Sequence, residues 1–311
     1  MRRGAVTTEL ACGTDASTLG SGSGGTAIGI LSQGIAQDAT ALGYSAGAAA
    51  PNATAIGALS EAANDGATVL GADIGDAGMV GRYTVTIGAG AVGIVDTAPL
   101  ASGAYSVAIG GGDGSASGLL DCTPTCDGAK ATGDLAIAIG THSAASGFAS
   151  VALGIDSTAA GLQAVAVGIS TIAHGDGSVA LGSEAEANGD VSTAVGPGAL
   201  ASGLGSFAGG VVATANGASS VALGNNAKVS GDNSIGIGLG ATTLVNLPGG
   251  AAIVGTNAVA IGNAATAAGN GSIALGLRAS TYGPDVRPVR RMPSPSATPP
   301  TRHAMALSPS A

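Results

Sequence analysis

A glycine recurs every 14 residues through the middle of the chain, and this spacing restricts the possible folds more than any other feature of the sequence. One series runs from Gly140 to Gly238 in steps of 14, and a second series, from Gly147 to Gly231, lies halfway between. The repeating unit therefore consists of two seven-residue halves, each ending in glycine. A chain of such units stacks repeat on repeat instead of folding around one central core.

The amino-acid composition agrees with a fold made of thin layers. The 311 residues include 56 glycines and no tryptophan, and aromatic residues make up 2% of the chain. Charged residues are 9% and hydrophobic residues 45%, a balance that excludes a disordered polar chain. So few large side chains cannot fill a thick globular core. The glycines lack the every-third spacing of collagen, and no apolar run is long enough to span a membrane.

A short phrase of alternating residues precedes each closing glycine of the first series. Ser-Val-Ala-Leu-Gly occupies residues 150–154 and returns at 178–182 and 220–224. A period of two in β-branched and other aliphatic residues predicts a short β-strand. A helix is excluded because a glycine every seven residues would cost it about 1 kcal/mol each relative to alanine. We therefore predict an all-β fold with two short strands in each 14-residue coil.

Aligning the repeats gives two columns of residues with different predicted roles. The residue before the closing glycine is aliphatic, and we predict that it faces the core of the coil. These predicted core residues are Ile109, Ile139, Leu153, Val167, Leu181, Leu223, Ile237, Ile261 and Leu275. The preceding residue points to the opposite face of the strand and is alanine in nearly every coil, which predicts that another copy of the chain covers this face closely. The predicted subunit-interface residues are Ala108, Ala138, Ala152, Ala166, Ala180, Ala194, Ala222, Ala260 and Ala274.

Stacked coils with glycine at the bends form a parallel β-solenoid. Sixteen coils spaced by about 4.7–4.9 Å would make a rod of roughly 75 Å. We predict an irregular N-terminal segment at residues 1–24, head repeats at 25–277 and a Pro/Arg-rich disordered tail at 278–311. Longer steps between glycines indicate insertions, which are the expected places for ligand specificity. The insertions lie near residues 72–87, 89–105, 111–133 and 239–257.

The repeats resemble the head domain of the trimeric autotransporter adhesins, the YadA-like heads. The repeat of that family has the form Ser-Val-Ala-Ile-Gly followed by x-x-Ser-x-Ala-x-Gly, as in residues 106–110 and 150–161 here. The resemblance covers residues 26–277 and implies a single-stranded, left-handed parallel β-roll that assembles as a homotrimer. It also implies a non-enzymatic virulence adhesin on the cell surface, or outer membrane, of a Gram-negative bacterium. Its partners would be host matrix, host cell-surface receptors or other bacteria.

Some members of that family bind collagen through a repeat that begins Asn-Ser-Val-Ala-Ile-Gly. The most similar segments here, residues 233–238 and 257–262, both depart from it, so collagen stays an open partner and the ligand is unknown. The signal peptide, coiled-coil stalk and membrane anchor of the family are not visible in the sequence. This leads to the hypothesis of a head fragment that does not itself insert into a membrane.

Few residues are of types that could form a disulfide, bind a metal ion or catalyse a reaction. Cys122 and Cys126 lie in the third insertion, where they either close a small disulfide loop in an oxidising compartment or remain free thiols. His142 and His174 occupy different positions of their repeats and are predicted to be solvated. We predict no catalytic, metal-binding or cofactor-binding residues. The net charge of −9 disfavours nucleic acid as a partner.

Two other functions stay open. A structural spacer in a surface or phage appendage would share the repeats without binding a ligand. The column Thr26, Thr40, Thr54 and Thr68 would suit ice binding, but later coils carry valine at this position, which assigns the column to the core.

Overall fold

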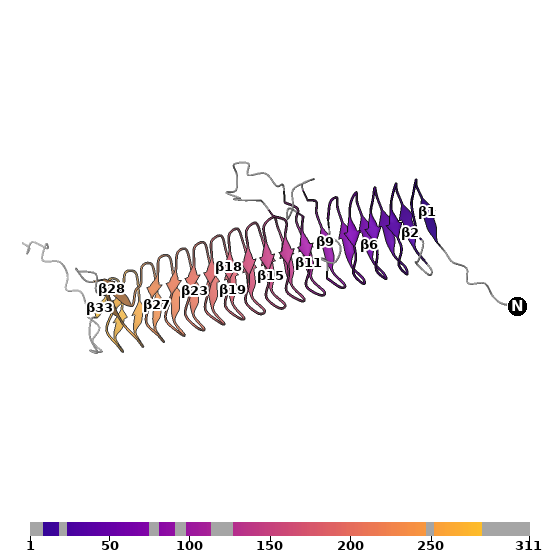
Figure 1. Ribbon diagram of the computed structural model, residues 1–311. Helices are drawn as coiled ribbons and strands as arrows, with labels where there is room; N and C mark the ends of the chain where they lie inside the picture. The colour runs from indigo at the N-terminus through magenta and orange to yellow at the C-terminus, as the bar shows by residue number, and fades with distance from the viewer. Residues whose placement is uncertain are drawn as a thin grey trace, which may run out of the picture.

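The protein folds into one long rod of stacked coils (Figure 1). The computed structural model describes residues 9–18, 24–74, 81–90, 98–112, 127–246 and 252–281. All regular structure within these ranges is β-strand, which confirms the predicted all-β solenoid. The predicted disulfide partners Cys122 and Cys126, and the predicted tail from residue 282 onward, lie outside the described residues.

A parallel sheet of 17 strands runs along the rod, with one three-residue strand in each coil. Neighbouring strands pair in register, so that Ala152 lies beside Ala138 on one side and Ala166 on the other. These long strands are β1 (Leu10–Cys12), β2 (Thr26–Ile28), β4 (Thr40–Leu42), β6 (Thr54–Ile56), β8 (Thr68–Leu70), β9 (Val85–Ile87), β11 (Val107–Ile109), β13 (Ile137–Ile139), β15 (Val151–Leu153), β17 (Val165–Val167), β19 (Val179–Leu181), β21 (Thr193–Val195), β23 (Phe207–Gly209), β25 (Val221–Leu223), β27 (Ile235–Ile237), β30 (Val259–Ile261) and β32 (Ile273–Leu275).

A two-residue strand follows the long strand in most coils and pairs with its counterpart in the next coil. These short strands are β3 (Gln33–Gly34), β5 (Gly47–Ala48), β7 (Glu61–Ala62), β10 (Leu100–Ala101), β12 (Lys130–Ala131), β14 (Ala144–Ala145), β16 (Thr158–Ala159), β18 (Ile172–Ala173), β20 (Glu186–Ala187), β22 (Leu200–Ala201), β24 (Thr214–Ala215), β26 (Lys228–Val229), β31 (Thr266–Ala267) and β33 (Ser280–Thr281). An antiparallel hairpin, β28 (Leu244–Asn246) with β29 (Ala252–Val254), interrupts this series.

The repeats extend beyond the predicted boundaries at both ends. β1 pairs in parallel with β2, so the segment 1–24, predicted to be irregular, contains the first coil. β33 pairs with β31, which places the start of the predicted tail in the last coil. The predicted insertions are also narrower than expected, because β10 and β12 are regular short strands within two of them.

The two glycine series differ in backbone conformation. Gly154, which closes a coil, has a φ of +133°, a conformation that residues with a Cβ rarely adopt. Gly161, of the second series, lies outside that region, but a Cβ there would collide with the carbonyl oxygen of Gly175 in the next coil. The first series therefore makes a bend that the second does not. Both series let successive coils approach closely, because a Cβ on Gly154 would also collide with the carbonyl oxygen of Gly168.

The side chains of the long strands point in the opposite directions to those predicted: the alanines face inward and the larger aliphatic residues face outward. The alanines predicted to form a subunit interface are all 0% exposed inside the coil: Ala108, Ala138, Ala152, Ala166, Ala180, Ala194, Ala222, Ala260 and Ala274. The aliphatic residues predicted to form the core are half-buried or exposed on the outer face: Ile109, Ile139, Leu153, Val167, Leu181, Leu223, Ile237, Ile261 and Leu275.

Both column assignments are therefore wrong, and the reason is the width of the coil. A 14-residue coil encloses a narrow space between its long and short strands. Ala152 packs there in one cluster with Ala145 and Ala159 of the short strands. A leucine side chain is too large for this space, so alanine fills the interior and the larger aliphatic residues face outward.

Extra residues enter only one half of the coil. Seven residues separate the second glycine from the closing glycine across the long strand, even in irregular coils, as from Gly81 to Gly88 and from Gly103 to Gly110. The lengthened segments lie in the other half, which carries the short strand: residues 71–81, 88–103, 110–133 and 238–255. The half-coil that carries the long strand is therefore constant in length.

Candidate functional site

The outward side chains of the long strands form an apolar surface, which we call the long-strand face. It consists of the first and third residues of each long strand, such as Val151 and Leu153 of β15. None of these residues is charged. Leu181 and Ile261 are 36% and 39% exposed, although both are aliphatic. An apolar surface that continues along a whole rod is unusual for a monomer and is typical of a protein–protein interface.

The threonine column also lies on the long-strand face. Thr26, Thr40, Thr54 and Thr68 pair in register along four coils and are half-buried. The prediction that placed this column in the core is wrong, because the column shares the outward orientation of the valines that replace it later. The first part of the long-strand face is thus more polar than the rest.

The short strands present polar side chains on a separate surface. Lys130, Thr158 and Glu186 occupy the same position in β12, β16 and β20, and each is half-buried while the alanine that follows it is buried. Charges of both signs in one column are typical of a face in contact with water. The same column also holds Leu100, Ile172 and Leu200, so this surface is mixed in polarity. The insertions all leave from this half of the coil, so one side of the rod is uncharged and constant in length, and the other carries charges and insertions.

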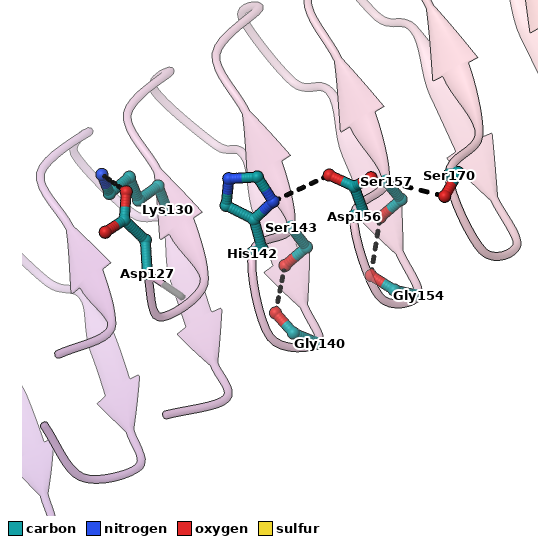
Figure 2. A network of polar contacts seen from close by, with 9 residues as sticks. All are labelled: Asp127, Lys130, Gly140, His142, Ser143, Gly154, Asp156, Ser157 and Ser170. Atoms are coloured by element: carbon teal, nitrogen blue, oxygen red, sulfur yellow. Dashed lines mark hydrogen bonds and ion pairs between the residues drawn. The ribbon is translucent and has the colours of Figure 1, made fainter. Parts of the chain in front are cut away.

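Polar side chains connect neighbouring coils at the turn after the closing glycine (Figure 2). His142 Nδ1 lies 2.7 Å from Asp156 Oδ1, and Ser170 Oγ donates to Asp156 Oδ2 at 3.3 Å. The three residues are 14 apart and lie in consecutive coils. His142 was predicted to be solvated, and this prediction did not include a contact with Asp156. The 14-residue spacing between the two residues could have revealed the contact.

This polar group is not arranged as a catalytic triad. His142 and Ser170 contact different oxygens of the same carboxylate, so the histidine is not placed to take the serine proton. His142 and Asp156 are both about half exposed, at 47% and 49% of their side-chain surface. Asp127 and Lys130 form a separate ion pair of 2.6 Å beside them. The arrangement connects coil to coil at the surface.

Aromatic side chains meet at the other turn, which precedes the long strand. The rings of Tyr83 and Tyr105, from successive coils, stack with centroids 5.3 Å apart and planes 13° apart. The Tyr83 hydroxyl donates to Asp65 Oδ2 at 3.0 Å, and Arg82 lies 3.5 Å from the same oxygen. The hydrogen bond to Asp65 and its negative charge raise the pKa of Tyr83 above its ordinary value of 10.0. The sequence did not predict this pair, because the insertions obscure its shared position in the repeat.

Aspartates at the same turn bond to the backbone of the preceding coil. Asp134 Oδ1 accepts the N–H of Ala104 at 2.8 Å, and Asp176 Oδ1 accepts the N–H of Leu162 at 2.9 Å. These carboxylates are exposed at fixed positions on the edge of the rod.

The described part of the chain holds no group of three or more His, Cys, Asp or Glu residues that could bind a metal ion. No helix in the same part of the chain could cross a membrane.

Comparisons with known proteins give one family. A family model described as the YadA head domain repeat matches segments that together cover more than half of the chain: residues 35–60, 127–143, 131–154, 145–171, 159–185, 173–199, 187–213, 215–241 and 254–279. Among solved structures, the collagen-binding domain of the Yersinia adhesin YadA is 23% identical over 65% of this chain and 92% of that chain. Its TM-score is 0.28, so the likeness carries no structural argument. None of the curated proteins compared with the chain matches it.

Proposed function

The chain belongs to the family of YadA head domain repeats, and from this membership we propose that it is the head of a bacterial surface adhesin. In this proposal the protein is not an enzyme and is displayed at the cell surface. It assembles with two further copies and attaches the bacterium to host matrix, host cells or other bacteria. Three copies of each contact surface would raise the strength of attachment through avidity.

One observation carries the proposal: the long-strand face holds no charged residue along its length and is mostly aliphatic, while all extra residues enter the opposite half of the coil. A surface that packs against identical copies tolerates neither charge nor insertions, whereas a surface that meets ligands tolerates both. The subunit interface is thus proposed for the Val, Ile and Leu columns, in place of the alanine column. The half-coil that carries the short strand and the insertions is proposed as the ligand-facing side.

An attachment assay tests whether the protein binds host matrix or host cells. Purified chain is applied to immobilised collagen, to other matrix proteins and to cultured host cells, and bound protein is quantified. The proposal expects saturable binding to at least one of these surfaces. A chain that is folded and assembled but binds none of them, and does not cross-link bacteria, would contradict the adhesin role and support a structural spacer.

A second candidate, ice binding, is favoured by the outward position of Thr26, Thr40, Thr54 and Thr68. It requires this part of the long-strand face to be free, whereas the proposed assembly covers it. Thermal hysteresis in a solution of the purified chain would support ice binding, and its absence would support the adhesin.

A further inference from the structure

Large exposed side chains occupy one turn in five consecutive coils. They lie at the turn that precedes the long strand, and both flanking coils instead carry an aspartate followed by glycine, Asp65–Gly66 and Asp176–Gly177. We call this surface the turn ridge. Its members are Tyr83, Tyr105, Leu135, Phe148 and Leu162, which are 45%, 59%, 49%, 47% and 53% exposed.

The turn ridge concentrates a residue type that is rare in the protein. The whole chain has four tyrosines, two phenylalanines and no tryptophan, and the ridge holds half of these aromatic residues. Tyr83 and Tyr105 also have positive φ angles of 54° and 58°, which are unfavourable for bulky side chains. The same φ occurs at this turn position in other coils, as at Gln163 and Val191, so it belongs to the turn and not to the ridge. Aromatic residues that are exposed together are characteristic of recognition surfaces.

Carboxylates accompany the aromatic rings. Asp134 lies in the coil between those of Tyr105 and Phe148, and its Oδ1 is fixed by the N–H of Ala104. Its Oδ2 makes no hydrogen bond within the described residues. Asp176 ends the ridge with the same arrangement toward Leu162. Among the described residues of these turns the one cation is Arg82, which lies 3.5 Å from Asp65, so the described part of the ridge is negative as a whole.

We propose that the turn ridge binds a cationic, extended segment of another protein, through its Arg or Lys side chains. A guanidinium or ammonium group gains from the face of an aromatic ring and from a carboxylate at the same time, and the ridge offers both side by side. The protein's net charge of −9 would attract such a segment from solution. The turn ridge would be one of the ligand-binding surfaces of the adhesin, so this inference rests on the proposed function.

A labelled synthetic peptide in which Arg alternates with Ser tests the site by fluorescence anisotropy with the assembled full chain. Replacing both rings, as Tyr105→Leu with Phe148→Leu, keeps the surface apolar and is expected to weaken binding about fivefold or more. Asp134→Asn keeps the acceptor for Ala104 but removes the charge, and is expected to weaken binding about threefold. Higher salt should weaken binding to the unmodified chain as well.

A matched control variant lies at the same turn outside the ridge. Asp232 Oδ1 accepts the N–H of Ala218 at 2.8 Å, as Asp134 does for Ala104, so Asp232→Asn should leave peptide binding unchanged. The proposal is overturned if a peptide with Gln in place of Arg binds equally well, or if control and ridge variants weaken binding alike.

Two further outcomes separate this proposal from others. If ridge variants lower the assembly mass and leave peptide binding unchanged, a second copy covers the ridge and the proposal is wrong. Attachment to matrix without peptide binding would refute the turn ridge alone. Peptide binding without attachment to any host surface and without cross-linking of bacteria would refute the adhesin role alone.

Discussion

Serine hydroxyls buried inside the coils fall into two groups. Ser143 Oγ donates to the carbonyl oxygen of Gly140 at 2.7 Å, and Ser157 bonds to Gly154 in the same way. Ser178 and Ser192, which precede long strands, are enclosed with no hydrogen-bond partner among the residues that the structure describes. Ala164 occupies the same position as Ser178 one coil earlier, so the fold accepts alanine there.

This difference predicts opposite effects of the same substitution. Ser178→Ala removes an unpaired buried hydroxyl and should raise the free energy of unfolding by up to about 1 kcal/mol. Ser143→Ala removes a hydrogen bond and should lower it by about 1 kcal/mol. Urea unfolding of both variants measures the two effects, and equal destabilisation by both would contradict this account of the interior.

Tyr83 predicts a stability change at high pH. Because the bond to Asp65 raises the folded-state pKa above 10.0, folding favours the protonated phenol. The stabilisation is therefore complete below the unfolded-state pKa and is lost as the pH rises through the folded-state pKa. Asp65→Asn should bring the pKa of Tyr83 back toward its ordinary value, as followed by ultraviolet absorbance of the phenolate. An unchanged titration curve would show that Asp65 does not hold the proton.

At the scale of the coil, backbone stacking depends on the second glycine series. A Cβ on Gly161 would collide with the carbonyl oxygen of Gly175, whereas a Cβ on Gly177, in the turn of the next coil, would have no described atom within 4 Å. Gly177→Ala should therefore cost about 1–2 kcal/mol, from its left-handed φ alone.

Gly161→Ala should cost more than Gly177→Ala, because it pushes two coils apart and breaks the pairing of their strands. Chemical denaturation compares the two variants directly. If Gly177→Ala is the more damaging, then bend conformation, and not the distance between coils, limits the stability of the stack.

The sequence predicts the coil but not the direction of its faces. The period of 14 and the alternation in Ser-Val-Ala-Leu-Gly are enough to place each long strand. Alternation separates Ala152 from Leu153 without indicating which is inside, and a uniform alanine column fits a tight interior as well as a tight interface. In the structure the alanine column lies in the interior. The width of that interior depends on the distance between the long and the short strand, and the sequence does not give this distance.

The sites depend on the same missing information. The His142–Asp156 contact follows a regular step of 14, and so lies within reach of sequence comparison. The turn ridge joins coils across the long insertions, where Tyr83 and Tyr105 are 22 residues apart. Counting back from the closing glycines Gly88 and Gly110 gives both tyrosines the same turn position, but the insertion bounds predicted at 72–87 and 89–105 enclosed them both.

At the scale of the whole molecule, the long-strand face would be exposed to water along the rod if copies of the chain did not cover it. Placing two charges there, as Val165→Glu with Val179→Glu, should prevent assembly because buried carboxylates would lack partners. Thr158→Glu with Thr214→Glu adds the same charge to the short strands and should leave assembly intact. Light scattering of both double variants checks the expectation, and equal loss of assembly in the two would refute a role specific to the long-strand face.

The solution mass of the unmodified chain tests the central claim most directly. Sedimentation equilibrium on purified protein, with circular dichroism to show that it is folded, gives the mass without assumptions about shape. The account predicts three times the chain mass of 28.6 kDa, because the long-strand face must be covered by like copies. A folded protein of 28.6 kDa at all concentrations would contradict it.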